Sequence, residues 1–310
     1  MPKGDVRDLA AFAYRAAPEL WRRISKDIKR DVESAPRHPR LNTWPRTGLH
    51  AAWIGHSTVA ISIDGFVVLT DPVFSNRIGI RLGPATLGLK RLVEPALTAA
   101  QIPHPDLILL SHAHMDHFDL RSLRKLERRS TTVITAVNTS DLLRVKRYRA
   151  VHELRWGESM RVGPATVRAF EVNHWGARMR NDTQRSYNGY VIEAGRYRVV
   201  FGGDTAHTDL FKKVRTSKAV DLAIMPIGAY NPWIRAHCTP EQALQMANDV
   251  GADFILPVHH RTFALSSEPV AEPMERLLSA AGAAEERICL REIGGEFHWA
   301  KSFDASAMRM

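Results

Sequence analysis

The feature that most constrains this chain is a dense polar run placed directly after a short apolar one. Residues 107–110 read LILL, and residues 111–119 read SHAHMDHFD. Four consecutive large aliphatic residues predict a buried strand. Alternate side chains of a strand share a face, so His112 and His114 are expected to point at one spot, and Asp116 and His117 follow at the turn into a helix. These residue types suit zinc, and also iron or manganese. The alternative is a polar loop of solvated histidines.

Further candidate ligands follow other predicted strands. Asp204 stands in FGGDT, where two glycines allow close approach of the backbone, and its carboxylate is suited to bridge two metals. Taken singly, each of these residues is an ordinary polar loop residue, but together they complete the ligands for two metals. They are His174 after residues 166–172, Asp204 after residues 197–201, and His259 and His260 after residues 254–257.

The order of predicted elements indicates the fold class. Strand-rich segments that end in helices occur twice along the chain, which predicts an α/β fold. We expect a four-layer αββα sandwich, with two mixed sheets face to face and helices outside. Predicted strands cover residues 50–63, 66–70, 107–110, 132–136, 159–162, 166–172, 187–194, 197–201, 222–226, 254–257 and 288–292, and predicted helices cover residues 120–129, 141–148, 240–250 and 273–281.

Residues 1–45 are expected to form a helical extension before a hydrolase domain at 46–310. Leu20, Trp21, Ile24 and Ile28 have helical spacing among arginines and lysines. Such a basic amphipathic helix can lie on a membrane or pack on its own domain.

Composition bounds the location and the partners. The two cysteines, Cys238 and Cys289, offer no disulfide framework, which suits a reducing cytoplasm. No stretch approaches the ~20 apolar residues that cross a bilayer, and the start lacks the apolar segment of a secretory signal. We therefore expect a cytoplasmic protein, with membrane association left open. The formal net charge of +10 favours anionic partners or reflects a solvated basic surface.

Several strings resemble one family. HAHMDH at 112–117, followed by a single histidine, GGDT and a late histidine, resembles the metallo-β-lactamase fold superfamily. Four more strings resemble its branch of N-acylphosphatidylethanolamine-hydrolysing phospholipase D and bacterial relatives. They are WIGHSTVAISIDGFVVLTDPVFS at 53–75, NHWG at 173–176, MPIGAYNPW at 225–233 and HHRTFALSSEP at 259–269.

The resemblance implies a ligand set for two divalent ions, zinc first and iron or manganese as alternatives. Its first metal is held by His112, His114 and His174, its second by Asp116, His117 and His259, and Asp204 bridges them. The branch usually has Trp-Gly after the last ligand, whereas this chain has His260-Arg261. His260 therefore stays an alternative to His259 at that position.

Other residues receive roles beside the metals. Asp116 is expected to orient the attacking hydroxide as well as to bind metal, and His237 to protonate the leaving oxygen. A surface histidine is the alternative for His237. Asp71 and His56 are candidates to orient the ligand imidazoles; the less favoured alternative for Asp71 is to cap the turn at Pro72. Tyr230 and Trp233 are expected either to line the substrate cleft or simply to pack.

The resulting hypothesis is a zinc-dependent hydrolase of phosphodiester bonds in phospholipid-like substrates. A lactonase or another carboxylic ester or amide hydrolase on the same metals is the alternative. A nucleic-acid phosphodiesterase is a second alternative, disfavoured because no RNA-binding appendage is recognisable and the basic clusters fit solvated helix faces. A non-enzymatic scaffold is disfavoured by the complete ligand set. The oligomeric state is left open.

Overall fold

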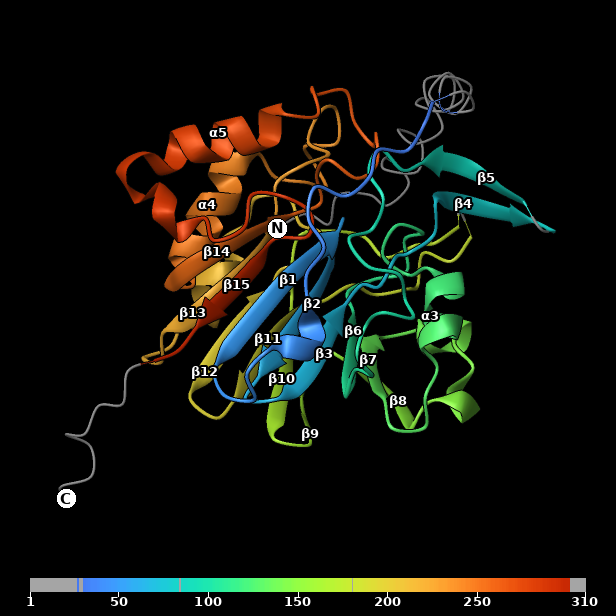
Figure 1. Ribbon diagram of the computed structural model, residues 1–310, viewed down its shortest axis with the longest axis horizontal. Coiled ribbons are helices and arrows are strands. Elements are labelled where there is room, and N and C mark those ends of the chain that lie inside the picture. The colour runs from blue at the N-terminus through green and yellow to red at the C-terminus, as the bar shows by residue number, and fades with distance from the viewer. Residues whose placement is uncertain (1–26, 28–29, 84, 180, 302–310) are drawn as a thin grey trace.

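Two mixed β-sheets form the centre of the molecule in the computed structural model, which describes residues 27, 30–83, 85–179 and 181–301 (Figure 1). The first sheet has seven strands in the order β15-β1-β2-β3-β6-β7-β8. Its pairs are antiparallel from β15 to β3 and parallel from β3 to β8. The strands are β1 (Leu49–Gly55), β2 (Thr58–Ile63), β3 (Phe66–Thr70), β6 (Leu107–Leu110), β7 (Thr132–Ala136), β8 (Ala150–Leu154) and β15 (Glu296–Trp299).

The second sheet has six strands in the order β14-β13-β12-β11-β10-β9. The pairs from β14 to β12 are parallel, and the remaining pairs are antiparallel. A separate two-stranded hairpin, β4–β5, projects from the body (Figure 1). These strands are β4 (Arg77–Leu82), β5 (Ala85–Lys90), β9 (Ser159–Val162), β10 (Ala165–Phe170), β11 (Gly189–Ala194), β12 (Tyr197–Phe201), β13 (Val220–Pro226) and β14 (Ala252–Val258).

Helices cover the outer faces of the sheets. Helix α3 (Leu120–Leu126) packs on the first sheet through Leu123 and Leu126. Helices α4 (Pro240–Asp249) and α5 (Glu272–Ala281) pack on the second. Between residues 30 and 301, the other helical elements of the described chain are short 3₁₀ turns at Leu41–Thr43, Ser140–Leu142, Val145–Arg147, Asp209–Val214 and Gly282–Arg287.

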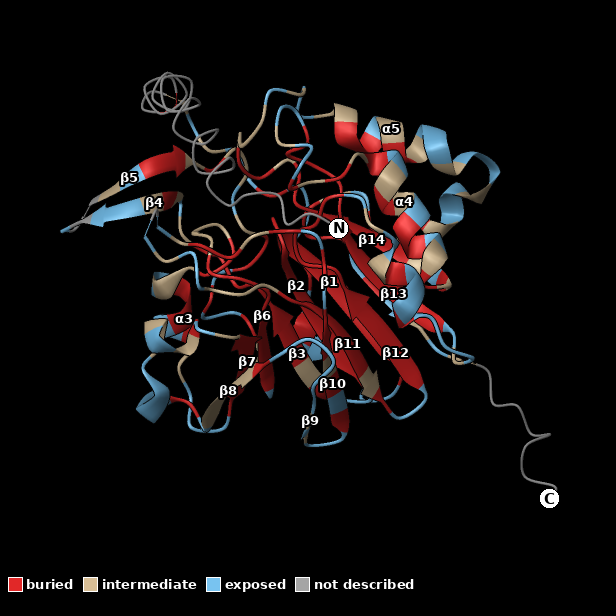
Figure 2. Ribbon diagram, turned by 180° about the vertical axis from the view of Figure 1, so that it is seen from behind, coloured by how far each residue is buried: buried red, intermediate tan, exposed pale blue. Residues whose placement is uncertain are grey.

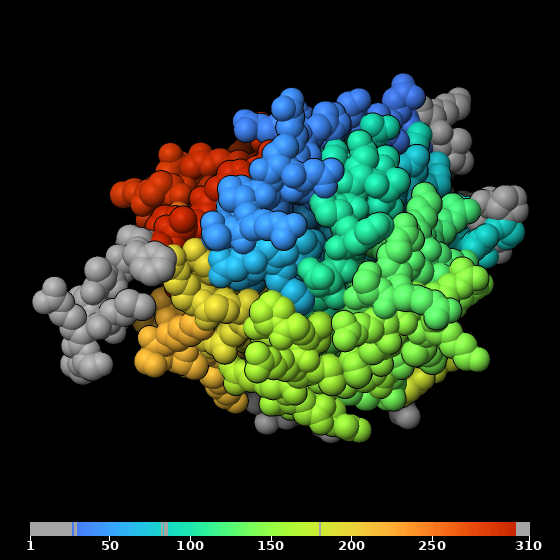
Figure 3. All heavy atoms as spheres, turned by 60° about the horizontal axis from the view of Figure 1, so that its bottom comes forward, coloured from blue at the N-terminus to red at the C-terminus, as the bar shows by residue number. Residues whose placement is uncertain are grey.

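The strand sequences explain this layering. Every residue of β1 is buried, because its alternate side chains enter two different cores. Leu49, Ala51 and Trp53 lie between the sheets, whereas Ala52 and Ile54 face the layer of α3. Figure 2 shows the buried strands of both sheets stacked at the centre. Figure 3 views the edge that carries β9, where the two halves of the chain lie side by side. The expected four-layer αββα sandwich is therefore confirmed.

Two predicted elements are wrong. Residues 141–148 form two 3₁₀ turns separated by the extended Leu143, because Leu142, Leu143 and Tyr148 reach the core while residues 144–147 stay exposed, so no continuous helical face is buried. The predicted strand at 288–292 makes only an isolated bridge from Ile288 to Ile255, and the last strand is β15 instead. Prediction also missed β4, β5 and β8. It placed the end of α3 three residues late, and it merged β1 and β2 into one strand.

The predicted N-terminal helix lies almost wholly outside the described residues, so the division at residue 45 stays a prediction. From residue 30 onward the chain lies against the body through a bridge between Glu33 and Val93. No helix in the described ranges is long and apolar enough to cross a membrane.

Candidate metal centre

The candidate residues all follow the carboxyl ends of strands, and this places them at one edge of the sandwich. His56 follows β1, Asp71 follows β3, Asp204 follows β12 and His259 follows β14. Because β3 and β6 are parallel, as are β12, β13 and β14, these ends meet. The strand order therefore brings together residues up to about 200 positions apart in the sequence.

The first cluster consists of His112, His114 and His174, whose ligand atoms all lie within 4.8 Å of one another. His112 Nε2 is 2.8 Å from His114 Nδ1, and His174 Nε2 is 3.3 Å from the same atom. The Nδ1–H of His174 donates to the Ala236 carbonyl at 2.8 Å, which turns its Nε2 toward the cluster.

The second cluster consists of Asp116, His117 and His259, joined by His56. Asp116 Oδ2 is 3.5 Å from His259 Nε2 and 3.6 Å from His117 Nε2. His56 Nε2 lies 3.1 Å from the same oxygen, so His56 contacts a candidate ligand.

Asp204 stands between the two clusters. Its Oδ2 is 3.0 Å from the Nε2 atoms of both His117 and His259. The same oxygen is 4.0 Å from His112 Nε2 and 3.9 Å from His174 Nε2. The flanking glycines allow this position, because a Cβ on Gly203 would crowd Ser111 and the Asn188 carbonyl. One carboxylate thus faces both groups of imidazoles.

Asp71 holds the ring of His117. Its Oδ2 accepts from His117 Nδ1 at 2.7 Å and from Ser111 Oγ at 2.5 Å, and its Oδ1 accepts from the Ser111 amide at 2.7 Å. Ser111 Oγ also lies 2.8 Å from His112 Nδ1. Prediction missed Ser111, although its position directly before His112 was a usable signal. Arg178, also missed, donates to the carbonyls of Ala113 and Phe118 and so fixes the loop; the sequence offers no signal for that contact.

Three of these residues adopt backbone angles that are uncommon for side chains of their type. The φ values are +53° at His56, +31° at Asp71 and +64° at His259. Strained backbone of this kind concentrates at functional sites, where the surrounding structure holds it in place.

The neighbours of His259 distinguish it from His260. His259 occurs in two of the groups of described residues that could hold a metal, and His260 occurs in none. Instead, the His260 ring stacks on Trp53 with centroids 4.6 Å apart. We therefore assign the candidate ligand position to His259.

His237 and the predicted cleft residues are arranged differently. His237 Nδ1 lies 3.9 Å from Asp204 Oδ2 and has no hydrogen-bond partner among the described residues. The Trp233 carbonyl accepts from the His237 amide at 3.0 Å, so Trp233 supports that loop. Tyr230 is buried and donates its hydroxyl to Glu272 of α5 at 2.7 Å. The Tyr230 hydroxyl is thus engaged in a hydrogen bond within the fold.

Electrostatics divide the histidines into two kinds. Burial, together with neighbouring imidazoles, lowers the pKa of His114 to about 3 and that of His112 well below its usual value. Burial also opposes charge on His117 and His259, but Asp204 and Asp116 outweigh it. They raise the pKa of His259 to about 9 and that of His117 well above its usual value. Burial lowers the pKa of His237 well below its usual value, which favours a neutral ring there.

The donor set fits metal ions. Several buried side-chain atoms have no hydrogen-bond partner among the described residues, and buried polar atoms are normally paired. Those at the centre include His117 Nε2, His259 Nε2 and Asp204 Oδ1. Imidazole nitrogens and carboxylate oxygens are the ligands that zinc and related ions take in hydrolytic sites.

The chain is similar in sequence to known proteins over most of its length. Residues 67–260 match the family model described as "Beta-lactamase superfamily domain". The chain is 34% identical over 253 residues to an uncharacterized protein of Mycobacterium tuberculosis, covering 78% of this chain and 67% of that protein. It is 31% identical over 268 residues to the mitochondrial N-acyl-phosphatidylethanolamine-hydrolyzing phospholipase D of Saccharomyces cerevisiae, covering 82% of this chain and 56% of the yeast protein.

Solved structures share the fold. The isothiocyanate hydrolase from Delia radicum gut bacteria aligns with a TM-score of 0.65 at 17% identity, covering 81% of this chain and 99% of that one. The metallo hydrolase Igni18 from Ignicoccus hospitalis aligns with a TM-score of 0.61 at 18% identity, covering 83% and 100%.

Proposed function

The chain belongs to the metallo-β-lactamase superfamily of metal-dependent hydrolases, and from this premise we propose that it hydrolyses phosphodiester bonds in phospholipids of the N-acylphosphatidylethanolamine type. The observation that carries the metal-dependent part of this proposal is the position of Asp204, whose Oδ2 lies within 4.0 Å of nitrogens from both imidazole clusters. A carboxylate placed in this way suits a centre of two ions.

The residues would divide between two zinc ions. His112, His114 and His174 would hold one ion, Asp116, His117 and His259 the other, and Asp204 would bridge them. When bound, such ions polarise the phosphoryl oxygen and make water acidic enough to attack near neutral pH. Neutral imidazoles are the ligand form that binds metal, and burial already favours it at the first cluster.

The remaining side chains position the ligands and handle protons. Asp71 fixes the tautomer of His117 by accepting its Nδ1–H, which leaves Nε2 as the ligand atom. Asp116 would orient the attacking water, and His56 holds that carboxylate by its 3.1 Å contact. His237, half-buried and with a free Nδ1, would donate a hydrogen bond to the leaving oxygen.

The substrate class is supported by relatives rather than by the metal centre, because this fold carries many chemistries. N-acyl-phosphatidylethanolamine-hydrolyzing phospholipases D from Saccharomyces cerevisiae and Caenorhabditis elegans match at 31% and 29% identity. The net charge of +10 also suits an anionic substrate.

The test is metal analysis of the purified protein combined with a substrate panel. The panel contains N-acylphosphatidylethanolamine, phosphatidylcholine, bis-p-nitrophenyl phosphate, an acyl-homoserine lactone and single-stranded DNA. We expect two equivalents of metal and release of phosphatidic acid from the first substrate, lost on chelation and regained with zinc. The variant Asp204→Ala should lose turnover while its circular dichroism spectrum stays unchanged, which would show that the fold is kept. Turnover of the lactone alone, or of DNA alone, would refute the phospholipid assignment.

A further inference from the structure

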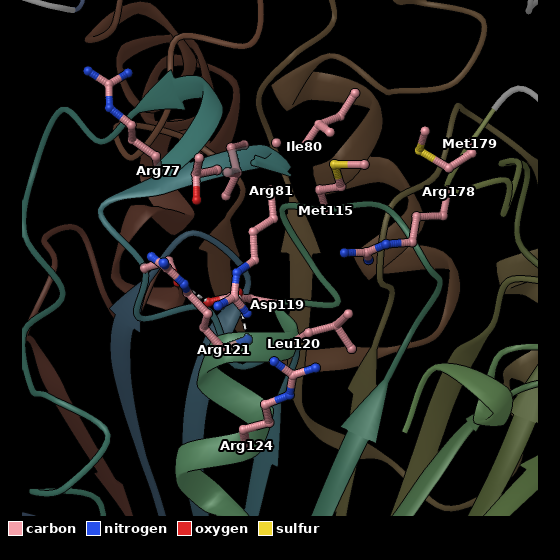
Figure 4. A pocket seen from close by; sticks show the side chains of 14 residues that line it. Arg77, Ile80, Arg81, Met115, Asp119, Leu120, Arg121, Arg124, Arg178 and Met179 are labelled. Carbon is pink, nitrogen blue, oxygen red and sulfur yellow. Dashed lines mark hydrogen bonds between the residues drawn. The ribbon is translucent and has the colours of Figure 1, made fainter. Parts of the chain in front are cut away.

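A cavity of about 250 Å³ lies between the β4–β5 hairpin and the start of α3 (Figure 4). Met115, which stands between the candidate ligands His114 and Asp116, forms part of its wall. The opposite wall comes from the β4–β5 hairpin, and the rest comes from the start of α3 and from residues 178–179. The cavity thus connects the projecting hairpin with the loop that carries the metal-binding motif.

Arginines dominate the lining of this cavity. It contains five arginines and one carboxylate, Asp119. That carboxylate is already used as the N-cap of α3 and as the acceptor for Ser75 and Ser122. Among the described residues, no carboxylate forms an ion pair with the four arginines Arg77, Arg81, Arg124 and Arg178. A concentration of uncompensated guanidinium groups favours phosphate.

The hairpin is amphipathic. Ile78 and Leu89 lie at its base and are buried against Val73 and Phe263. Further out on the same face, Ile80 pairs in register with Leu87, and these side chains are 47% and 41% exposed. The apolar face of the base therefore continues past the body of the protein into solvent, where nothing in the described chain covers it.

The opposite face of the hairpin is polar. Arg77, Arg81, Thr86 and Lys90 alternate with the apolar side chains along the two strands. The neighbouring Met179 adds another apolar side chain, 48% exposed, at the rim of the cavity. Exposed aliphatic side chains bordered by arginines combine the two attractions of an interfacial element, burial in acyl chains and attraction to anionic headgroups.

We propose that the β4–β5 hairpin and the arginine-lined cavity dock the protein on bilayers of anionic phospholipid. Ile80 and Leu87 enter the acyl boundary, and Arg81 and Arg124 bind headgroup phosphates at the mouth of the cavity. Charge complementarity selects this occupant, because an apolar protein partner would leave the arginines without counter-charges. The delivery of a headgroup from this cavity to the metal centre rests on the proposed phospholipid substrate, whereas the docking itself does not.

The hairpin is also packed against the metal centre. Phe263 shares a cluster with Ile78 and Leu89 at the hairpin base, and its ring lies 5.3 Å from that of His56. His56 in turn contacts Asp116. Direct packing therefore links the base of the hairpin, through Phe263 and His56, to a candidate ligand.

The first test is sedimentation of the full chain with vesicles of phosphatidylcholine alone or with 30% phosphatidylglycerol. We expect binding only to the anionic vesicles, weakened by salt. The variant Ile80→Asp should weaken binding by about tenfold or more, because it places a charge where the acyl boundary is expected. The double variant Arg81→Glu with Arg124→Glu should weaken it by a similar factor, since each basic residue near such a surface contributes about 1 kcal/mol. Matched controls are Val145→Asp, at a side chain 50% exposed outside the cavity, and Arg128→Glu on the surface.

A second measurement reports insertion directly. An environment-sensitive fluorophore on Ile80→Cys should shift to the blue with anionic vesicles, while the same label on Val145→Cys should not. Labelling is selective because the native Cys238 is buried and burial raises the pKa of the Cys289 thiol to about 12.

The outcomes separate cleanly. Loss of binding in both variant sets together with the blue shift supports the proposal. Binding that survives Ile80→Asp, binding equal on neutral and anionic vesicles, or binding of a 20-mer single-stranded DNA without binding of vesicles overturns it. Vesicle docking without hydrolysis of N-acylphosphatidylethanolamine would refute the proposed substrate but would still support the docking surface.

Discussion

At the scale of single residues, the chemistry of this centre depends on which ring nitrogen of a histidine is left to bind metal. For two candidate ligands a neighbouring group decides this by accepting a hydrogen bond from the other nitrogen. His174 is oriented by the Ala236 carbonyl and His117 by Asp71, and in both rings Nε2 is left for a metal. Substitution of a contact that fixes the tautomer of a ligand typically costs about 10- to 100-fold in metal affinity or activity. Single substitutions in this outer layer therefore test the site as directly as removal of a ligand.

The substitution Asp71→Asn should weaken metal binding or turnover by about 10- to 100-fold. It removes the charge that holds the His117 Nδ1–H at 2.7 Å while it keeps the shape of the side chain. Zinc affinity by competition with a chromophoric chelator measures the effect, and Asp253→Asn at an exposed position is the matched control. Equal affinity in the two variants would contradict the assigned role of Asp71.

The substitution His237→Ala should lower kcat by about 100-fold and leave the metal content unchanged. This magnitude is typical of losing one hydrogen-bond donor to charge that develops in the transition state. Steady-state kinetics together with metal analysis check it. A parallel fall in bound metal would instead make His237 a ligand, as its grouping with Asp204 and His259 allows.

Elements of the fold differ in how far their sequences specify them. The strands that position the ligands contain apolar runs, such as LILL in β6 and VVF at the end of β12, and these were predictable because both faces are buried. The candidate ligands at their ends were predictable because they are polar residues that directly follow such buried strands. The β4–β5 hairpin was missed because its glycines at 79 and 88 dilute the strand signal. Those glycines are needed, since a Cβ on either would collide with the facing strand.

Prediction from the sequence failed where distant contacts decide the outcome. Residues 141–148 have helical spacing, but only Leu142, Leu143 and Tyr148 pack on the core while residues 144–147 remain exposed, so packing does not stabilise a continuous helix. At the site, Arg178 lies about 60 residues from the carbonyls to which it donates. No local pattern encodes such a pairing.

At the start of α4, Thr239→Ala should destabilise the protein by about 1 kcal/mol. Thr239 accepts from the Gln242 amide, and Gln242 in return accepts from the Thr239 amide at 3.0 Å, which forms a capping box. Chemical denaturation measures the loss, and Thr239→Ser should retain most of the stability. No difference between the alanine and serine variants would count against this cap.

At the scale of the whole molecule, each half of the sandwich contributes a carboxylate and an imidazole to the same site. The first half supplies Asp116 and His117, and the second supplies Asp204 and His259. Without metal, the raised pKa values of His117 and His259 mean that these rings carry protons near neutral pH and neutralise the two carboxylates. Protons and metal ions therefore compete for one site that spans both sheets.

This competition sets the dependence of stability on pH. In the metal-free protein the folded state binds more protons at His117 and His259 than the unfolded chain does. Its free energy of unfolding should therefore fall as the pH rises from about 6.5, through the His259 pKa of about 9. Metal must displace those protons, so zinc affinity should rise over the same range and level off above it. Denaturant titrations of the metal-free protein and chelator competition, both at pH 6.5, 7.5 and 8.5, measure the two trends. Affinity that does not change with pH would show that these rings are already neutral before metal binds.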